Sequence, residues 1–189
     1  MQALPVLQTP RLTLRVPLVE DADAIAAFVS LNREHFRPSE PERQDSYFTP
    51  SFWVAELSTL SARVLREELV SFILLPRSAP SQEVIGHCTL SGIVRGPFQA
   101  AYLGYGLAHV HVSQGLMFEA LQSMLHFSFE SLNLHRIMAN YVPTNERSAR
   151  LLSRLGFQRE GYAPAYLRLD GRWQDHILTA LTNDKWRPA

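Results

Sequence analysis

Hydrophobic and polar positions alternate in some segments and recur at helical spacing in others, and so predict a series of short strands and helices. Residues 11–16 (RLTLRV) alternate polar and apolar side chains, which is typical of a half-buried strand. Residues 19–31 begin with acidic side chains and continue with apolar ones at helical spacing, which favours a helix that starts at the acidic end. The prolines and charges of residues 37–46 (RPSEPERQDS) predict a loop.

The middle of the chain predicts one long helix followed by three strands. Thr49 and Pro50 suit the N-cap and the first position of a helix over residues 49–69. The short connections between the strands favour antiparallel pairing. The three predicted strands cover residues 69–76, 83–94 and 99–108.

The C-terminal half continues the alternation of helices and strands. Asn145 suits the N-cap of one helix, Gly156 suits its end, and Asp170-Gly171 suits a hairpin turn. The order β-α-α-β-β-β-α-β-α-β-β shows no internal repeat and no linker, so it predicts one α/β (α+β) domain over residues 1–189. The elements of this half are a helix over residues 114–132, a strand over 135–142, a helix over 145–156 and two strands within 165–182.

Composition narrows the class of protein. Hydrophobic residues make up 46% and charged residues 19% of the chain, which is ordinary for a globular domain. Eighteen basic and eighteen acidic side chains cancel, so charge gives no reason to expect nucleic acid or membrane as a partner. The single cysteine, Cys88, excludes an internal disulfide and suits a reducing compartment. We see neither a signal peptide nor a membrane-spanning run, so we expect a cytoplasmic protein.

The junction between the strand at residues 99–108 and the helix after it is the first candidate for chemistry. Backbone N–H groups at a helix N-terminus attract a phosphate, and a glycine such as Gly115 lets the ligand approach closely. Every helix that follows a strand has such an end, so the pattern alone fits a plain turn equally well.

Three segments carry a resemblance to a known family. Residues 100–121, 134–163 and 169–181 resemble the GNAT N-acetyltransferases, and more narrowly the RimJ/RimL branch, which acetylates N-terminal amines of ribosomal proteins. The pattern N-x-x-S-x-x-L-x-x-x-L-G-F from Asn145 to Phe157 is the most specific part of this likeness. The resemblance implies a mixed, mostly antiparallel sheet of about seven strands flanked by about four helices.

The resemblance also implies an acetyl-CoA site and no metal. In this fold the strand before the junction carries a bulge and splays from its neighbour, and the pantetheine arm enters the slot between them. The implied backbone contacts to pantetheine come from Tyr105, Gly106, Leu107 and Ala108. The implied pyrophosphate contacts are the N–H groups of Val112, Ser113, Gln114, Gly115, Leu116 and Met117. Asn145 and Asn140 would bond the pantetheine amides, although Asn145 is also an ordinary N-cap and Asn140 an ordinary strand residue.

The implied chemistry is direct attack of a neutral amine on the thioester. It requires a base, an oxyanion donor and an acid near the leaving thiolate. A strand N–H would be the donor, and Ser148 would be the acid or else a solvated helix residue. Tyr105 and Glu40 are further catalytic candidates. The acceptor would be a protein N-terminal α-amine, such as that of a ribosomal protein, held by residues 37–46 with Glu40 and Glu42 as contacts.

Several positions depart from the family pattern. Val112 stands in place of Gln or Arg, Ser113 in place of a frequent glycine, and Tyr102 and Ala165 in place of acids found in relatives. A positive φ at the β-branched Val112 would be strained. These departures leave a second hypothesis open: a non-catalytic binding or assembly module with a degenerate CoA loop.

The base and the role of the histidines are also open at this point. Water-mediated bases could be Glu40, Glu160, Asp175 or His176. His109 and His111 would point to one face of a strand. Such a pair can bind zinc, but no Cys, His or carboxylate partners stand at recognisable spacing, so we expect no metal; alternatively the two histidines lie near the CoA phosphates. We expect Trp173 and Asp175 to stabilise a hairpin first and to contact substrate second. The acceptor's identity and the choice between monomer and homodimer are not set by the sequence.

Overall fold

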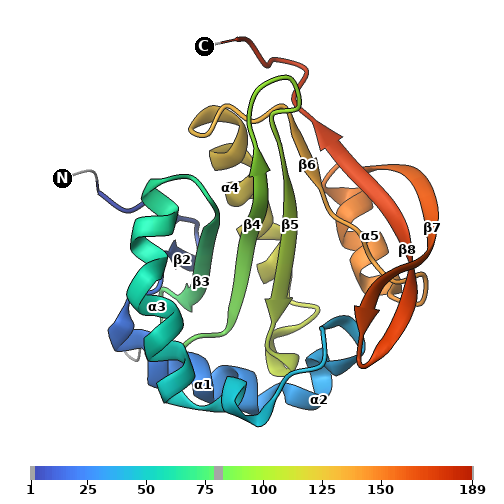
Figure 1. Ribbon diagram of the computed structural model, residues 1–189. Helices are drawn as coiled ribbons and strands as arrows, with labels where there is room; N and C mark the ends of the chain where they lie inside the picture. The colour runs from blue at the N-terminus through green and yellow to red at the C-terminus, as the bar shows by residue number, and fades with distance from the viewer. Residues whose placement is uncertain (1–2, 79–82, 189) are drawn as a thin grey trace.

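The computed structural model describes residues 3–78 and 83–188, through which one mixed sheet runs (Figure 1). Within these residues, eight strands lie side by side in the order β1-β2-β3-β4-β5-β6-β8-β7. Neighbouring strands are antiparallel except β5 and β6, which are parallel. The strands are β1 (Val6–Gln8), β2 (Leu12–Arg15), β3 (Val70–Pro76), β4 (Gly86–Val94), β5 (Ala100–Leu107), β6 (Arg136–Met138), β7 (Gln158–Leu169) and β8 (Arg172–Thr182).

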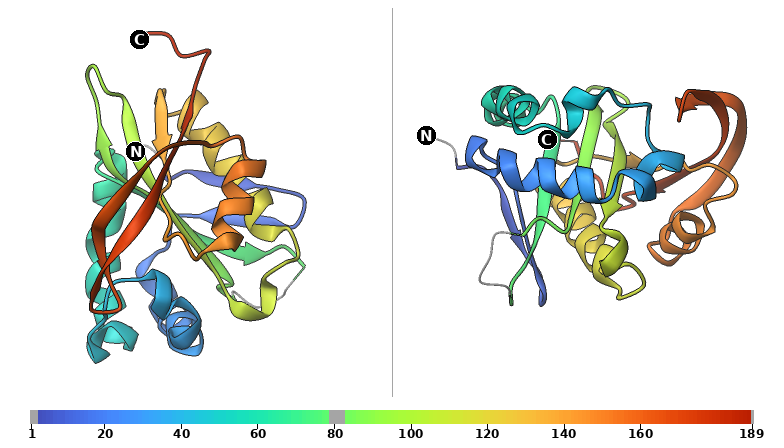
Figure 2. Two further views of the ribbon diagram at one scale, coloured as in Figure 1. Left: turned by 90° about the vertical axis from the view of Figure 1, so that its right-hand side faces the viewer. Right: turned by 90° about the horizontal axis from the view of Figure 1, so that it is seen from below.

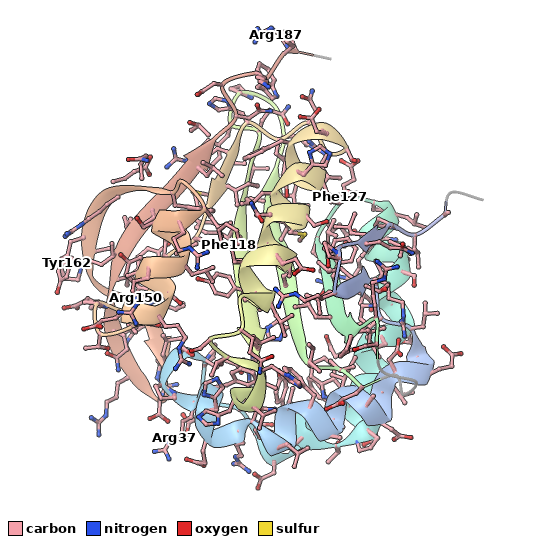
Figure 3. All side chains as sticks on the ribbon, turned by 180° about the vertical axis from the view of Figure 1, so that it is seen from behind. Arg37, Phe118, Phe127, Arg150, Tyr162 and Arg187 are labelled. Atoms are coloured by element: carbon pink, nitrogen blue, oxygen red, sulfur yellow. The ribbon has the colours of Figure 1, made fainter. Side chains whose placement is uncertain are left out.

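Helices cover both faces and one end of this sheet. Figure 3 shows α4 and α5 on one face, and Figures 1 and 2 show α3 on the other. Helices α1 and α2 run across the end of the sheet at which β5 finishes. The α-helices of the described chain are α1 (Ala22–Leu31), α2 (Arg33–Phe36), α3 (Pro50–Leu65), α4 (Leu116–Glu130) and α5 (Glu146–Arg154). Short 3-10 turns are η1 (Val19–Asp21), η2 (Arg37–Ser39), η3 (Asp45–Phe48) and η4 (His109–His111).

The hydrophobic core packs the sheet against α4 and against α1 and α3. The Phe72 ring of β3 meets the Phe127 ring of α4 edge-on, with 5.7 Å between centroids. Burial in this core raises the pKa of the Cys88 thiol to about 12. The predicted apolar face of α4 is confirmed, because all four of its side chains are buried: Met117, Leu121, Met124 and Leu125. This packing holds β4 and the adjoining β5 in position, and β5 is the strand that carries the site.

The structure confirms the fold class and corrects several boundaries. The described residues hold eight strands and five α-helices, where about seven and about four were expected. The additional strand β1 is too short to show a period in sequence, and it pairs with β2. Asn32 separates α2 from α1, and two 3-10 turns lie within or next to the predicted loop over residues 37–46. Part of the predicted connection at residues 77–82 lies outside the described residues.

Three corrections concern the region of the site and the hairpin beside it. Helix α4 begins at Leu116 instead of residue 114, because Gly115 at its N-cap has a left-handed backbone with φ of 77°. Strand β6 ends at Met138 instead of residue 142, because the chain there leaves β5 and follows β8. Strand β7 begins well before the predicted residue 165, at Gln158. None of the helices in residues 3–78 and 83–188 is both long and apolar enough to span a membrane.

Candidate active site

The edge of β5 that faces β6 is open along most of its length. The two strands pair only from Ala100 to Tyr102. The Gly106 carbonyl points toward β4, since it lies 2.7 Å from the position a Cβ on Gly86 would take. Backbone groups alternate in direction along a strand, so the N–H and C=O of Tyr105 and Leu107 point the other way. We call residues 103–107 of β5, on this side, the open edge.

The open edge agrees with the predicted separation of strands but not with every predicted contact. Gly106 faces β4, and the N–H of Ala108 donates to Ile85 at 2.8 Å, so neither residue offers that group to the open edge. The irregular pairing between β4 and β5 lies at Ser91–Val94 instead of at the end of β5. Only Tyr105 and Leu107 of the predicted pantetheine contacts therefore point their backbone the right way.

Helix α5 brings Ser148 to the side chain of Tyr105. Burial raises the pKa of Tyr105 to about 12, and a hydrogen bond with Ser148 acts in the opposite direction. The phenol is therefore protonated at neutral pH and able to donate. The predicted N-cap is confirmed, because the Asn145 side chain accepts a hydrogen bond from the Ser148 N–H at 3.0 Å. Two hydroxyl groups thus meet beside the open edge.

The turn from β5 into α4 carries its strain at an unexpected residue. Val112 has an extended backbone with φ of −67°, so the predicted strain at this residue is absent. Positive φ falls on Ser113, at 64°, and on Gly115, at 77°. Ser113 holds the position where relatives often have glycine, and the structure shows that position to be left-handed. The first N–H groups of α4 lack helical partners, as at any helix start, and are suited to an anion.

Two residues distant in sequence hold this turn, and sequence reasoning missed both. The Asn32 side chain accepts a hydrogen bond from the His109 N–H at 2.9 Å. The Arg11 guanidinium donates to the Gln114 carbonyl at 2.9 Å and pairs with Glu119 at 2.7 Å. Arg11 gave no signal beyond its place in a strand pattern, because its partners are remote in the chain. The turn is therefore fixed from the N-terminal part of the protein.

Asn140 has a structural role in the hairpin of β7 and β8. Its amide donates to the Tyr166 hydroxyl at 3.1 Å, and its carbonyl accepts from the Thr179 N–H at 3.1 Å. Both ends of the side chain are thus engaged, which favours the interpretation of Asn140 as an ordinary strand residue over a pantetheine contact.

A cavity of about 290 Å³ lies between α1, α2, the loop of residues 37–46 and Asp170 at the tip of the β7–β8 hairpin. We call it the acceptor cavity; its lining includes Phe36, Arg37, Glu40, Arg43, Tyr47 and Asp170. Burial raises the pKa of Glu40, and Arg43, at 3.7 Å, partly opposes this. Burial, assisted by Glu40, likewise raises the pKa of Tyr47 to about 12. The cavity therefore holds a carboxyl group that is a stronger base than usual.

The loop over the acceptor cavity touches the tip of the β7–β8 hairpin. The Asp170 N–H donates to the Glu40 carbonyl at 3.0 Å, and Arg37 pairs with Asp170 at 2.9 Å. The exposed Glu42 lies 3.7 Å from Arg168 of β7. Both carboxylates line the cavity, and the Glu40 side chain is 23% exposed, whereas that of Glu42 is 67% exposed.

His87 lies between the acceptor cavity and β5, and sequence reasoning missed it. Its ring is 2.7 Å from the position that a Cβ on Gly106 would take, so Gly106 is required here. The rings of Phe28 and Phe36 surround it at 6.1 and 6.2 Å between centroids. Burial, with the Arg43 charge, lowers the pKa of His87 to about 4, so the imidazole is neutral.

The other candidate bases belong to the hairpin. Glu160 pairs with Arg136, and Asp175 accepts hydrogen bonds from the Tyr162 hydroxyl and, at 2.8 Å, from the Ala165 N–H. This second bond holds Ala165 in a left-handed conformation, with φ of 45°, where the pairing of β7 is irregular. Asp175 therefore stabilises the hairpin, as expected.

Tyr166 contacts both His176 and Tyr102 in the same region. His176 is 3% exposed and packs on Tyr166 with 5.2 Å between ring centroids. A hydrogen bond with Tyr166 raises the pKa of Tyr102. Trp173 is 65% exposed and lies opposite Arg168 in the hairpin. These contacts organise the hairpin beside the site and leave Glu40 as the candidate base in a cavity.

The predicted strand placement of His109 and His111 is wrong. Both lie in the η4 turn, and the His109 ring packs edge-on against His35 of α2, with 5.1 Å between centroids. Across the described ranges of the chain, no group of three or more His, Cys, Asp or Glu side chains is arranged to hold a metal ion.

Comparison with known proteins identifies the family to which this site belongs. Residues 11–158 match the Acetyltransferase (GNAT) domain. The match covers well over half of the chain, so the protein belongs to this family and is a GNAT N-acetyltransferase.

Individual relatives place the protein within the RimJ/RimL branch of this family. It is 42% identical over 183 residues to the [Ribosomal protein uS5]-alanine N-acetyltransferase of Escherichia coli (strain K12), covering 97% of this chain and 93% of that one. Ribosomal-protein-S5-alanine acetyltransferase from Vibrio fischeri superposes with a TM-score of 0.92 at 36% identity, over 97% and 100% of the two chains. Mycobacterium smegmatis RimJ in complex with CoA-disulfide superposes with a TM-score of 0.86 at 27% identity, over 98% of this chain and 90% of that one.

Proposed function

We propose that this protein transfers the acetyl group of acetyl-CoA to the N-terminal α-amine of a protein, with a ribosomal protein as the acceptor. The observation that carries the proposal is the open edge of β5, where Tyr105 and Leu107 present their backbone groups between α5 and the acceptor cavity. The Escherichia coli relative is named for an alanine of ribosomal protein uS5, which supports this class of acceptor.

The donor is held mainly by backbone groups. The pantetheine amides pair with the backbone of Tyr105 and with the N–H of Leu107 in the manner of an added strand, since the Leu107 carbonyl is bonded to the His35 ring. The diphosphate lies on the free N–H groups at the start of α4, and Gly115 permits its close approach. The amide N–H₂ of Asn145, whose carbonyl already caps α5, is directed to the pantetheine.

The reaction proceeds by direct attack within a ternary complex. The neutral amine attacks the thioester carbon, and a backbone N–H of the open edge stabilises the developing oxyanion. The C–S bond then breaks, and the pair of Ser148 and Tyr105 delivers a proton to the thiolate. The nitrogen that has become the amide loses its second proton through water, which restores the proton of the pair. Glu40 takes the proton of the incoming ammonium through water, helped by its raised pKa.

Peptide acetylation followed by mass spectrometry tests this function. One peptide begins with alanine and contains an internal lysine, and its matched control has the same sequence with a blocked N-terminus. We expect a single acetyl group on the free N-terminus and none on the control. Acetylation of lysine in both peptides would contradict the proposed acceptor class.

Calorimetry with acetyl-CoA separates this function from the alternative of a non-catalytic module. We expect binding by the unmodified protein. If the turn had decayed, Val112→Gln with Ser113→Gly would instead strengthen binding greatly. Absence of binding at millimolar ligand would overturn the proposed function as a whole.

A further inference from the structure

Basic side chains from three elements meet where β5 passes into the η4 turn. His35 of α2 packs against His109 of η4, and its ring also bonds the backbone of Leu107. Arg147, in the first turn of α5, is near enough to disfavour the protonated form of His35. Figure 1 shows α2 at the end of β5, next to this turn. We call His35, His109 and Arg147 the basic cluster.

The basic cluster has no acidic partner in the described residues. The charges nearest to it along α2 are already paired, Glu34 with Arg37 at 3.4 Å and Arg33 with Asp45 at 3.2 Å. Within residues 3–78 and 83–188, none of the ion pairs includes a member of the cluster. Basic groups gathered without a counter-ion repel one another, and an anionic ligand relieves this repulsion.

We propose that the basic cluster binds the diphosphate of acetyl-CoA, together with the N–H groups at the start of α4. The inference rests on the proposed use of acetyl-CoA as donor. The donors of residues 112–117 are backbone N–H groups, and the one guanidinium beside Gly115, that of Arg11, is paired with Glu119. His35 and Arg147 add the missing charge from outside the turn, on the same side as the open edge of β5.

Ligand binding at this place is coupled to protonation of His35. Burial, and then the charges of His109 and Arg147, lower the pKa of His35 in the free protein. A diphosphate beside the ring raises that pKa again, so the complex holds a proton that the free protein lacks. Affinity therefore increases as the pH falls through the raised pKa of His35 in the complex and on toward its lowered pKa in the free protein.

Calorimetry on paired variants of the full chain tests the inference. We expect Arg147→Gln to raise the Kd for acetyl-CoA about tenfold, since a charge-assisted contact is lost. His35→Gln should raise it at pH 6 and remove most of the pH dependence. The matched controls are Arg150→Gln, on the outer side of α5 (Figure 3), and His126→Gln, exposed on α4; both should leave the Kd unchanged.

Truncated donors show which phosphate is bound. The effects should persist with S-acetyl-3′-dephospho-CoA, which keeps the diphosphate and lacks the 3′-phosphate, whose own titration near pH 6 would confuse the pH series. They should vanish with S-acetyl-pantetheine, which has no phosphate.

The outcomes separate this inference from the proposed function. Loss of the effects with the dephospho compound would overturn the assignment to the diphosphate. Equal affinities of wild type, Arg147→Gln and His35→Gln would overturn the inference while leaving the function intact. Absence of binding by the wild type would overturn both.

Discussion

The donor side and the acceptor side of the proposed site depend on different kinds of chemical group. On one side, the open edge and the turn into α4 offer mainly backbone groups, set by pairing and by two left-handed residues, Ser113 and Gly115. On the other, the acceptor cavity depends on the side chains of Glu40, Arg43 and Tyr47. Backbone groups survive most substitutions, so the donor side tolerates unusual residues such as Val112. A single change in the cavity alters its charge.

The donor side depends on side chains at one place, the hydroxyl groups of Tyr105 and Ser148 beside the open edge. We expect Tyr105→Phe combined with Ser148→Ala to lower kcat about 100-fold, since the thiolate loses its proton donors. The Kd for acetyl-CoA should hardly change. Steady-state kinetics and calorimetry measure the two quantities, with Tyr102→Phe, elsewhere on β5, as the control. An unchanged kcat would assign the pair a structural role.

In the acceptor cavity, Glu40→Gln should lower kcat/KM for the acceptor by about one order of magnitude. Burial raises the pKa of Glu40 above its usual 4.5, and the carboxylate is the active form, so the wild-type rate falls as the pH drops through that raised pKa. The rate of the Glu40→Gln variant should not show this fall with decreasing pH. The control is Glu42→Gln, at the more exposed carboxylate of the cavity, and equal pH profiles for wild type and Glu40→Gln would exclude Glu40 as the base.

The left-handed turn predicts opposite effects for two small substitutions. Gly115→Ala should destabilise the protein by about 1–2 kcal/mol, because an alanine disfavours positive φ. Ser113→Gly should stabilise it by about 0.5 kcal/mol, because relief of strain exceeds the entropy lost by glycine. Urea unfolding measures both changes. The same sign for the two variants would contradict the backbone account of this turn.

The smallest effect is expected at the contact between the cavity loop and the hairpin tip. Arg37→Gln removes an exposed ion pair with Asp170, and such pairs are weak in water. The acceptor KM should rise about twofold, with kcat unchanged and with a smaller difference at high salt. Arg63→Gln, which affects a remote pair with Glu68, serves as the control. A change in kcat would mean that the loop positions the reacting groups.

The sequence predicted the donor side better than the acceptor side, for physical reasons. Gly115 and Asn145 lie at helix starts, where local geometry restricts the residue type, so a pattern reveals them. Glu40 was expected from its loop, yet its burial depends on Tyr47 and Arg43 and on the hairpin tip, which no local pattern encodes.

Contacts between remote parts of the chain were out of reach of sequence reasoning. Arg11 and Asn32 hold the turn across long separations, and His87 meets Gly106 only once β4 and β5 pair. The family pattern marked Ser113 and Val112 as unusual residues, but only the backbone angles show that Ser113 has a positive φ and Val112 does not.

The pairing of β5 with β6 is short, so the sheet consists of two parts that are only weakly joined. Strands β1 to β5 form one part, and β6, β8 and β7 form another, joined through three residue pairs and through the packing of α5, where Arg154 lies over Phe118 of α4. A pantetheine arm that pairs with Tyr105 and Leu107 takes the place of the missing strand between these parts. The donor then completes the sheet, and we expect the amides of β6 to exchange faster in the free protein than in the complex with acetyl-CoA.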